Sequence, residues 1–213
     1  KFIFQAMKSH FLSQQIFKIN FKPIKDGTYY FDMTTFVLTK LLLKEINKGD
    51  RILDMGTGSS STIGLTLWKQ CGCYVVCSDI NPEIISMAQK NIEFNHAEIQ
   101  VKHSNLFENI KDNFDIVVFN PPYVPTKKGI SSNLSKEFQS QWDGGEDGSI
   151  VVKQFLEELD KTKDSHRAYL GINHLYLPKE KVVPIIETKN NLKLIRIYTH
   201  NFLPIDVFVI EKK

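Results

Sequence analysis

Past residue 50, short apolar runs alternate with segments whose apolar residues recur at helical spacing, and this alternation constrains the fold most. Five runs rich in Val and Ile end at polar or turn residues, as strands do: 51–55, 74–79, 99–103, 114–120 and 167–173. These runs are almost continuously apolar, which is typical of parallel strands buried on both faces. The sequence therefore predicts an α/β fold in which helices cover both faces of a mostly parallel sheet.

Four helices are expected in the same part of the chain: 61–69, 82–95, 148–160 and 179–188, the last interrupted or bounded by Pro184. The second has the clearest signals, because Asn81 is a favourable N-cap and Pro82 fits the first helical position. At the C-terminus, 192–199 and 206–211 are predicted strands joined by a short loop. The sheet is therefore expected to have seven strands and to end in an antiparallel hairpin.

Residues 1–48 are predicted to form an extension packed as a cap on a domain of residues 49–213. Apolar residues at helical spacing predict a helix over 33–46, capped by Asp32 or Thr34, whereas the mixed pattern of 11–21 gives no assignment. Lysines outnumber acids in the extension. It could form a weakly basic lip over a site or simply cover one edge of the sheet.

Composition excludes several classes of protein. The chain has 213 residues, 42% of them hydrophobic and 24% charged, which suits one large globular domain. A net charge of +3 permits RNA as a partner without requiring it. No run approaches the roughly 18 apolar residues of a membrane helix, and the first residues lack the features of a signal peptide. Cys71, Cys73 and Cys77 form neither a disulfide framework nor a four-ligand metal site. A cytoplasmic, metal-free protein is expected.

The first candidate site is a glycine turn that follows the predicted strand 51–55. Gly56 and Gly58 can take backbone angles closed to other residues and let a ligand approach closely. Such a turn lies at the carboxyl ends of parallel strands, where ligands bind. Asp79 ends the next strand, and its carboxylate can accept hydrogen bonds from both hydroxyls of a ribose. Its alternative role is a helix-start acid stabilised by the helix dipole.

The order of these residues distinguishes between nucleotide cofactors. A dinucleotide site expects a third glycine where Ser61 stands, and the acid Asp54 just before the turn would repel a pyrophosphate. The acid-first pattern Asp54-x-Gly56-x-Gly58 resembles the nucleoside-binding motif of class I S-adenosylmethionine methyltransferases, which have a Rossmann-like fold. The family usually has another glycine at the position of Ser60. The resemblance implies that Asp54 helps to hold the amino group of the cofactor's methionine part.

The resemblance extends to the end of the third strand. Family members often have Asp at the position of Asn105, where it accepts a hydrogen bond from the adenine amino group. Asn keeps a carbonyl acceptor, and Leu106 could line the adenine face; Asn105 could also be a simple turn residue. The expected cofactor-binding residues are Asp54, Gly56, Thr57, Gly58, Asp79, Ile80, Asn105, Leu106 and Asn120.

The fourth strand ends in a second candidate site, Asn120-Pro121-Pro122-Tyr123. Two prolines stiffen this loop and remove two backbone donors, so that oxygen acceptors dominate it. The Asn120 side chain and the Pro121 carbonyl could each accept one hydrogen of a planar NH2 group, while Tyr123 stacks on its face. Catalysis would then come from alignment and electrostatics without a strong base. The alternative is a rigid turn without a catalytic role.

At this position, N-P-P-Y resembles the hallmark of methyltransferases that act on adenine N6 or on glutamine side-chain amides. The extension to Thr126 and the glycine segment 142–148 resemble the HemK-like release-factor glutamine methyltransferases. Trp142 could contact substrate or pack in the core, and Gly144, Gly145 and Gly148 could form only a helix-entry turn. By contrast, 26–36 resembles the segment preceding the cofactor site in assorted RNA and archaeal methyltransferases.

The resemblance implies an N-methyltransferase whose acceptor is a release-factor glutamine or, alternatively, an RNA adenine, with a small activating partner protein as a further expectation. Lysines that could neutralise RNA phosphates, or lie in solvent, are Lys127, Lys128, Lys136 and Lys153. Two rivals stay open: an inactive binding subunit with the same fold, supported by Ser60 and Asn105, and more distantly a nicotinamide oxidoreductase.

Overall fold

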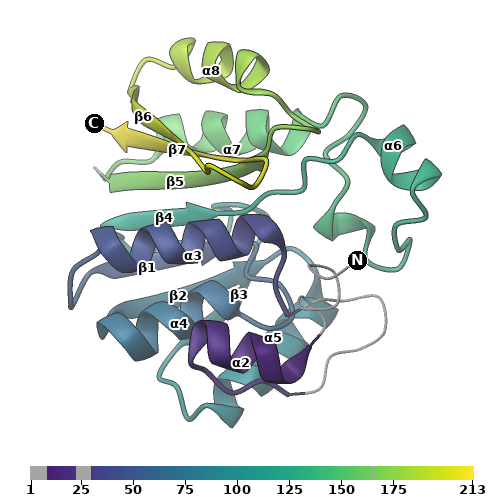
Figure 1. The fold of residues 1–213 in the computed structure, drawn as a ribbon. Coiled ribbons are helices and arrows are strands. Elements are labelled where there is room, and N and C mark those ends of the chain that lie inside the picture. The colour runs from purple at the N-terminus through teal and green to yellow at the C-terminus, as the bar shows by residue number, and fades with distance from the viewer. Residues whose placement is uncertain (1–8, 23–29, 165) are drawn as a thin grey trace.

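The computed structural model describes residues 9–22, 30–164 and 166–213. Its strands are β1 (Arg51–Met55), β2 (Tyr74–Asp79), β3 (Gln100–His103), β4 (Ile116–Phe119), β5 (His166–Asn173), β6 (Leu192–Thr199) and β7 (Ile205–Lys212). They form one sheet in the order β3-β2-β1-β4-β5-β7-β6 (Figure 1). β1 to β5 are parallel, and β7 runs antiparallel to both β5 and β6. The predicted seven-stranded sheet with a C-terminal antiparallel hairpin is confirmed.

The helices are α2 (His10–Phe17), α3 (Met33–Glu45), α4 (Thr62–Cys71), α5 (Pro82–Phe94), α6 (Thr126–Ser131), α7 (Ile150–Lys161) and α8 (Lys179–Glu187), with a 3-10 turn η1 (Gln139–Gln141). α2 occupies the segment that the sequence left unassigned. Asp32 caps α3, accepting a hydrogen bond from the Thr35 amide at 2.6 Å. Asn81 caps α5 in the same way, as its sequence predicts.

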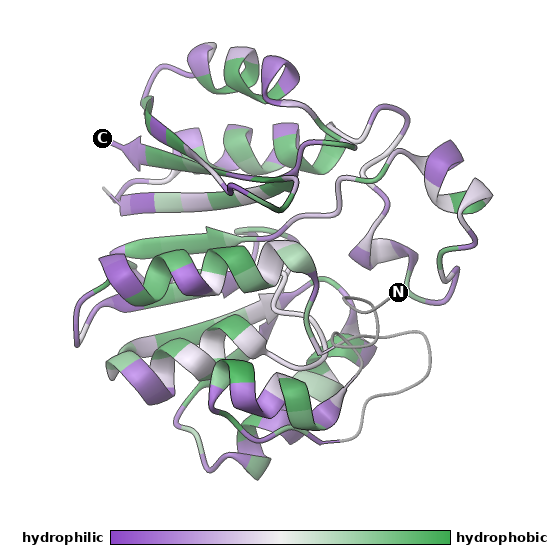
Figure 2. Cartoon of the chain, viewed as in Figure 1, coloured by the Kyte–Doolittle hydropathy of each residue, from purple (hydrophilic) through white to green (hydrophobic). Residues whose placement is uncertain are grey.

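Alternating strand residues divide the core into two layers. In β4, Ile116 and Val118 join the apolar cluster under α3 and α4, while Val117 and Phe119 join the cluster under α7 and α8. Burial on both faces explains why the strands read as continuous apolar runs. In Figure 2, β4 is hydrophobic along its length. Among the described residues, no helix is both long enough and apolar enough to cross a bilayer.

Most predicted boundaries differ from the structure by one or two residues, and three differences concern how an element begins, ends or continues. α7 begins at Ile150 rather than residue 148, because Gly148 has a positive φ of 82° that a helix does not allow. β4 is shorter than the predicted run 114–120. Pro184 lies inside a continuous α8 and neither interrupts nor ends it, since Val182 and Ile186 on either side are buried in the core.

Gly171 of β5 brings α3 close to the sheet. A Cβ at this position would lie 2.6 Å from both Leu38 Cδ1 and Thr34 Cγ2, closer than packed atoms approach. Only glycine therefore allows α3 to sit this close to β5. The contact fixes the N-terminal end of α3 beside the carboxyl ends of the strands. In the extension, residues 1–8 and 23–29, the latter including part of the 26–36 segment, lie outside the described residues.

Candidate active site

A cavity of about 710 Å³ lies at the carboxyl ends of β1, β2, β4 and β5. Both predicted constellations line it: Asp54, Gly56, Thr57, Gly58, Asp79, Ile80, Asn105, Leu106, Asn120, Pro122 and Tyr123. Pro121 is buried and is not among the lining residues. The parallel sheet thus brings together residues 69 positions apart, from Asp54 to Tyr123, because the carboxyl ends of its strands meet at one edge.

The glycine turn after β1 leaves room for a ligand. Gly56 and Gly58 have φ angles of 62° and 67°, which L side chains rarely adopt. A Cβ on Gly56 would meet the Phe119 ring at 2.9 Å, whereas a Cβ on Gly58 would meet nothing within 4 Å. Gly56 is therefore required for packing, and Gly58 keeps open space beside the backbone. That open space against a carboxylate-lined turn fits a cationic nucleoside cofactor.

Asp54 is buried beneath the turn. Its Oδ2 accepts hydrogen bonds from Thr57 Oγ1 at 2.7 Å and from the Gly64 amide at 3.0 Å. Burial outweighs these bonds and raises the pKa of Asp54 to about 6. A buried acid with a raised pKa gains from a cationic ligand nearby.

Asp79 faces the same space from the end of β2. Its Oδ2 accepts from the Gly58 amide at 3.3 Å and its Oδ1 from the Asn81 amide at 3.0 Å. Burial raises the pKa of this carboxyl as well. These bonds leave further lone pairs of both oxygens for hydroxyl donors of a ligand.

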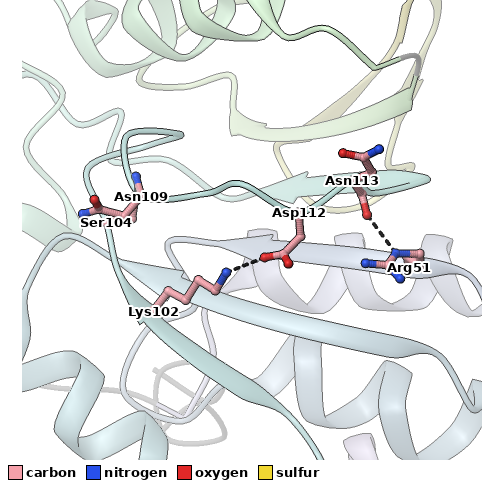
Figure 3. Close-up of polar contacts among 6 residues, drawn as sticks. All are labelled: Arg51, Lys102, Ser104, Asn109, Asp112 and Asn113. Carbon is pink, nitrogen blue, oxygen red and sulfur yellow. Dashed lines mark hydrogen bonds and ion pairs between the residues drawn. The ribbon is translucent and has the colours of Figure 1, made fainter.

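The loop after β3 holds Asn105 at the cavity. Ser104 Oγ donates to the Leu106 carbonyl at 2.9 Å and accepts from the Asn109 amide at 3.0 Å, closing a tight turn in which Leu106 has a φ of 45°. An ion pair between Lys102 of β3 and Asp112, which precedes β4, joins the two ends of the segment that contains this loop (Figure 3). Figure 3 also shows Arg51, which donates to the Asn113 carbonyl.

The structure explains the serine at the position where related motifs carry a third glycine. Ser60 Oγ donates to the Tyr30 carbonyl at 2.6 Å, and Thr62 Oγ1 donates to the same oxygen. Ser60 is buried, and both Ser60 and Tyr30 line the cavity. The Ser60 side chain therefore attaches Tyr30 to the segment that follows the glycine turn.

Asn120 is held by its amide nitrogen. Nδ2 donates to both carboxylate oxygens of Asp32, at 3.1 and 3.2 Å, and lies 3.2 Å from Thr35 Oγ1. Its Oδ1 is buried without a hydrogen-bond partner. A buried carbonyl oxygen without a donor costs free energy, so its presence in a cavity indicates a donor supplied by a ligand.

Tyr123 has its hydroxyl group engaged within the protein. The hydroxyl lies 2.7 Å from Thr34 Oγ1, and burial raises the pKa of the phenol well above its usual value. Its ring is nearly parallel to that of Tyr176, with centroids 6.3 Å apart. Tyr123 thus has a fixed ring and no role as a base. Thr34, Thr35 and Tyr176 also line the cavity. The sequence did not identify them as site residues and offered Thr34 only as an alternative helix cap. Tyr176 follows a predicted strand end, which is the signal that could have identified it.

The segment Trp142–Gly148 clamps the Asn-Pro-Pro-Tyr loop. Val124 pairs with Asp143: its amide donates to the Trp142 carbonyl at 2.8 Å, and its carbonyl accepts from Gly144 at 2.9 Å. Thr126 Oγ1 donates to Asp143 Oδ1 at 2.6 Å. The predicted alternative of a helix-entry turn is thus only part of its role.

Gly148→Ala is expected to disrupt this clamp. Its added Cβ would lie 2.4 Å from the Tyr123 carbonyl oxygen, at a φ of 82°. The matched control is Gly49→Ala, which has a similar φ of 89° but no atom within 4 Å of its Cβ. In the control, the free energy of unfolding should fall only by the cost of a left-handed backbone at an alanine, about 1–2 kcal/mol, and activity should not change. Gly148→Ala should lower the free energy of unfolding by about 1–3 kcal/mol more, measured by thermal unfolding, and should lose most of the methyltransferase activity that the sequence predicts. Equal effects in both variants would refute the clamp.

Residues 126–141, with α6 and η1, project from the sheet beside the cavity (Figure 1). The sequence predicted neither element. Trp142 packs its ring over Gly129, where a Cβ would lie 2.0 Å away, and its Nε1 donates to the Ser135 carbonyl at 2.8 Å. It also lines the cavity, so packing does not exclude substrate contact. Lys127, Lys128, Lys136 and Lys153 do not line it; Lys128 Nζ lies 5.5 Å from the centroid of the Tyr176 ring.

Comparisons with known proteins identify the family of the chain. The methyltransferase small domain family matches residues 29–163. A Methanocaldococcus jannaschii protein named as a protein N5-glutamine methyltransferase is 34% identical over 152 residues, which are 70% of this chain and 68% of that protein. The release factor glutamine methyltransferase of Lactococcus lactis is 28% identical over 170 residues, 78% of this chain and 62% of the relative.

Among solved structures, Mtq2 of E. cuniculi, in a complex with Trm112 that methylates the termination factor eRF1, has a TM-score of 0.60 and 23% identity. The likeness covers 88% of this chain and 98% of that one, and it shows the class I methyltransferase fold. On the family match, the cofactor is S-adenosylmethionine. The chain belongs to the methyltransferase small domain family and is an S-adenosylmethionine-dependent N-methyltransferase.

Proposed function

We propose that this enzyme methylates the side-chain amide of a glutamine in a translation termination factor. The observation that carries the proposal is the buried, unpartnered Oδ1 of Asn120 beside the stiff diproline loop. A primary amide offers two N–H donors in one plane. Asn120 Oδ1 accepts one of them, which aligns the nitrogen for attack. The predicted second acceptor, the Pro121 carbonyl, has no such role here, because Pro121 is buried and does not line the cavity.

Within the cavity, the cofactor half has its own set of side chains. Asp54 would hold the amino group of the methionine part, Gly58 would let the backbone of the turn approach the cofactor, and Asp79 would accept hydrogen bonds from the ribose hydroxyls. Asn105 would accept a hydrogen bond from the adenine amino group, and Leu106 would pack on the adenine ring. Bound there, the cofactor supplies a methyl group on a sulfonium. The remaining task of the protein is to position the acceptor nitrogen.

The charge of the cavity favours a neutral acceptor over a nucleotide. Four carboxylates line it, those of Asp32, Asp54, Asp79 and Asp143, and among the described residues no Lys, Arg or His lines it. A nucleotide brings phosphates, which nucleic-acid sites neutralise with Lys and Arg. A glutamine side chain carries no charge, and the cationic cofactor complements the carboxylates. The acidic cavity therefore supports the protein substrate.

The relatives support the same acceptor. Both sequence relatives described above are named for glutamine methylation, and the Mtq2–Trm112 complex methylates a termination factor. The enzyme is proposed to share this substrate class and to act with a small partner protein.

The test is transfer from methyl-labelled S-adenosylmethionine to two acceptors, a purified termination factor and total RNA. Each reaction is run with and without cell extract, so that a required partner is supplied. Label should enter the factor, resist RNase, disappear on protease treatment, and map to a glutamine by mass spectrometry. The Asn120→Ala protein is the matched control for background. Label confined to RNA would overturn the protein substrate in favour of an RNA base.

A further inference from the structure

We propose that Asp32 is a positioning residue for methyl transfer: it orients and polarises Asn120 so that its Oδ1 faces the acceptor. The proposal rests on the proposed function only in requiring a planar NH2 acceptor, whether an amide or a base. Asp32 lies 88 residues from Asn120 in the sequence, and no motif connects the two. The fold brings them together at the N-terminal end of α3.

The hydrogen bonds fix the orientation of the amide. A carboxylate only accepts, so Asn120 can meet Asp32 only with its nitrogen. Both oxygens of Asp32 are within hydrogen-bond distance of Nδ2, and Thr35 Oγ1 lies 3.2 Å from it. Turning the amide over would place Oδ1 against two carboxylate oxygens and leave the amide hydrogens facing the donor hydrogens of the substrate. Asp32 therefore makes the productive orientation the stable one.

Asp32 itself is held rigidly. The Thr35 amide donates to its Oδ1 at 2.6 Å, and the Phe36 amide donates to its backbone carbonyl at 3.1 Å. A negative side chain at a helix N-terminus is favoured by the helix dipole. Because Gly171 fixes the position of α3 against β5, the carboxylate has little freedom to follow Asn120 if the loop moves.

Capping of α3 does not require the contacts with Asn120. Ser and Asn cap helices about as well as Asp, so an aspartate is not needed for the helix. Donation to a carboxylate, in contrast, shifts electron density toward Oδ1, because linked hydrogen bonds polarise one another. A neutral cap would not have this effect.

The polarisation acts in the direction of the charge movement. During transfer the acceptor nitrogen supplies an electron pair to form the N–CH3 bond, the S–CH3 bond breaks, and the donor leaves as a neutral thioether. Positive charge thus moves onto the nitrogen until one of its protons passes to solvent. A more negative Oδ1, backed by a carboxylate, stabilises that nitrogen more in the transition state than in the ground state, which is the condition for faster chemistry.

Two cap-preserving variants test the proposal, Asp32→Asn and Asp32→Ser. Asn places an NH2 group against Nδ2 and should turn Asn120 over, so kcat should fall about 100-fold; Ser should lower it about 10-fold. The cofactor dissociation constant and the melting temperature should stay near wild type. The control for lost capping is Ser9→Ala, which removes the hydroxyl that caps α2 by accepting a hydrogen bond from the Leu12 amide. This variant should keep its kcat. Thr35→Val provides a second test if an Asp32 variant fails to fold.

Turnover is measured on whichever acceptor the labelling experiment identifies, so failure of the glutamine assignment leaves this test intact. In an Asn120→Ala background, Asp32→Asn should have no further effect, because Asp32 acts through Asn120. Without any ligand, the Nδ2 proton resonances of Asn120, assigned by their loss in Asn120→Ala, should move on Asp32→Asn. Unchanged kcat, losses that multiply in the double variant, or unmoved resonances would each overturn the proposal.

Discussion

Replacing Asn120 with alanine should lower turnover by about 10³-fold while leaving the affinity for S-adenosylmethionine nearly intact. Removing one preorganised polar group that stabilises a transition state costs about 10²–10³ in kcat. The cofactor keeps Asp54, Asp79 and the glycine turn, so its binding loses little. Single-turnover methyl transfer and calorimetric titration measure the two quantities separately.

The matched control is Asn191→Ala. The Asn191 side-chain amide also donates a hydrogen bond within the protein, to the Asp160 backbone carbonyl at 3.1 Å, but Asn191 does not line the cavity. This variant should keep its turnover. If Asn120→Ala also kept it, Asn120 would be only structural and the acceptor site would have to be sought elsewhere in the cavity.

Replacing Asp79 with alanine should have the reverse signature, raising the cofactor dissociation constant about 100-fold or more. Hydrogen bonds to a charged group contribute about 1.5–3 kcal/mol each, and two ribose hydroxyls lose their acceptor together. Once cofactor is saturating, turnover should recover to within a few-fold. Asp79→Asn keeps one acceptor oxygen, so its cofactor dissociation constant should lie between those of the wild type and of Asp79→Ala.

The control for Asp79 is Asp115→Ala, at the opposite end of the sheet. Asp115 Oδ2 accepts from the Arg51 amide at 2.8 Å, before β4 begins. Its removal should lower stability without changing the cofactor dissociation constant. A wild-type dissociation constant in Asp79→Ala would place the ribose elsewhere.

The sequence predicts those parts of the fold in which local and long-range requirements agree. β1 and β2 have the predicted bounds because their apolar runs are both strand-like and buried on both faces. α5 carries a cap, a proline and an acid at its start, all pointing to one boundary. α6 and η1 are short, polar and exposed, so no periodicity marks them.

The candidate site divides in the same way. Residues at strand ends, such as Asp79 and Asn120, are predictable because parallel strands bring their carboxyl ends to one edge. The sequence predicts Asp32 only as a helix cap, since the side chain that it orients is 88 residues away. Likewise, the bond between Thr34 and Tyr123 depends on how closely α3 approaches β5, which is a property of packing rather than of spacing.

One short stretch, residues 30–35, has a consequence for the minimal catalytic unit. Its Tyr30 carbonyl is tied to the cofactor turn through Ser60 and Thr62, while Asp32 and Thr35 hold Asn120. A protein shortened to begin at residue 49 would retain all seven strands of the sheet yet lose the brace common to both ligand loops. Changes within Tyr30 through Thr35 would therefore alter how the methyl donor and the acceptor are placed relative to each other.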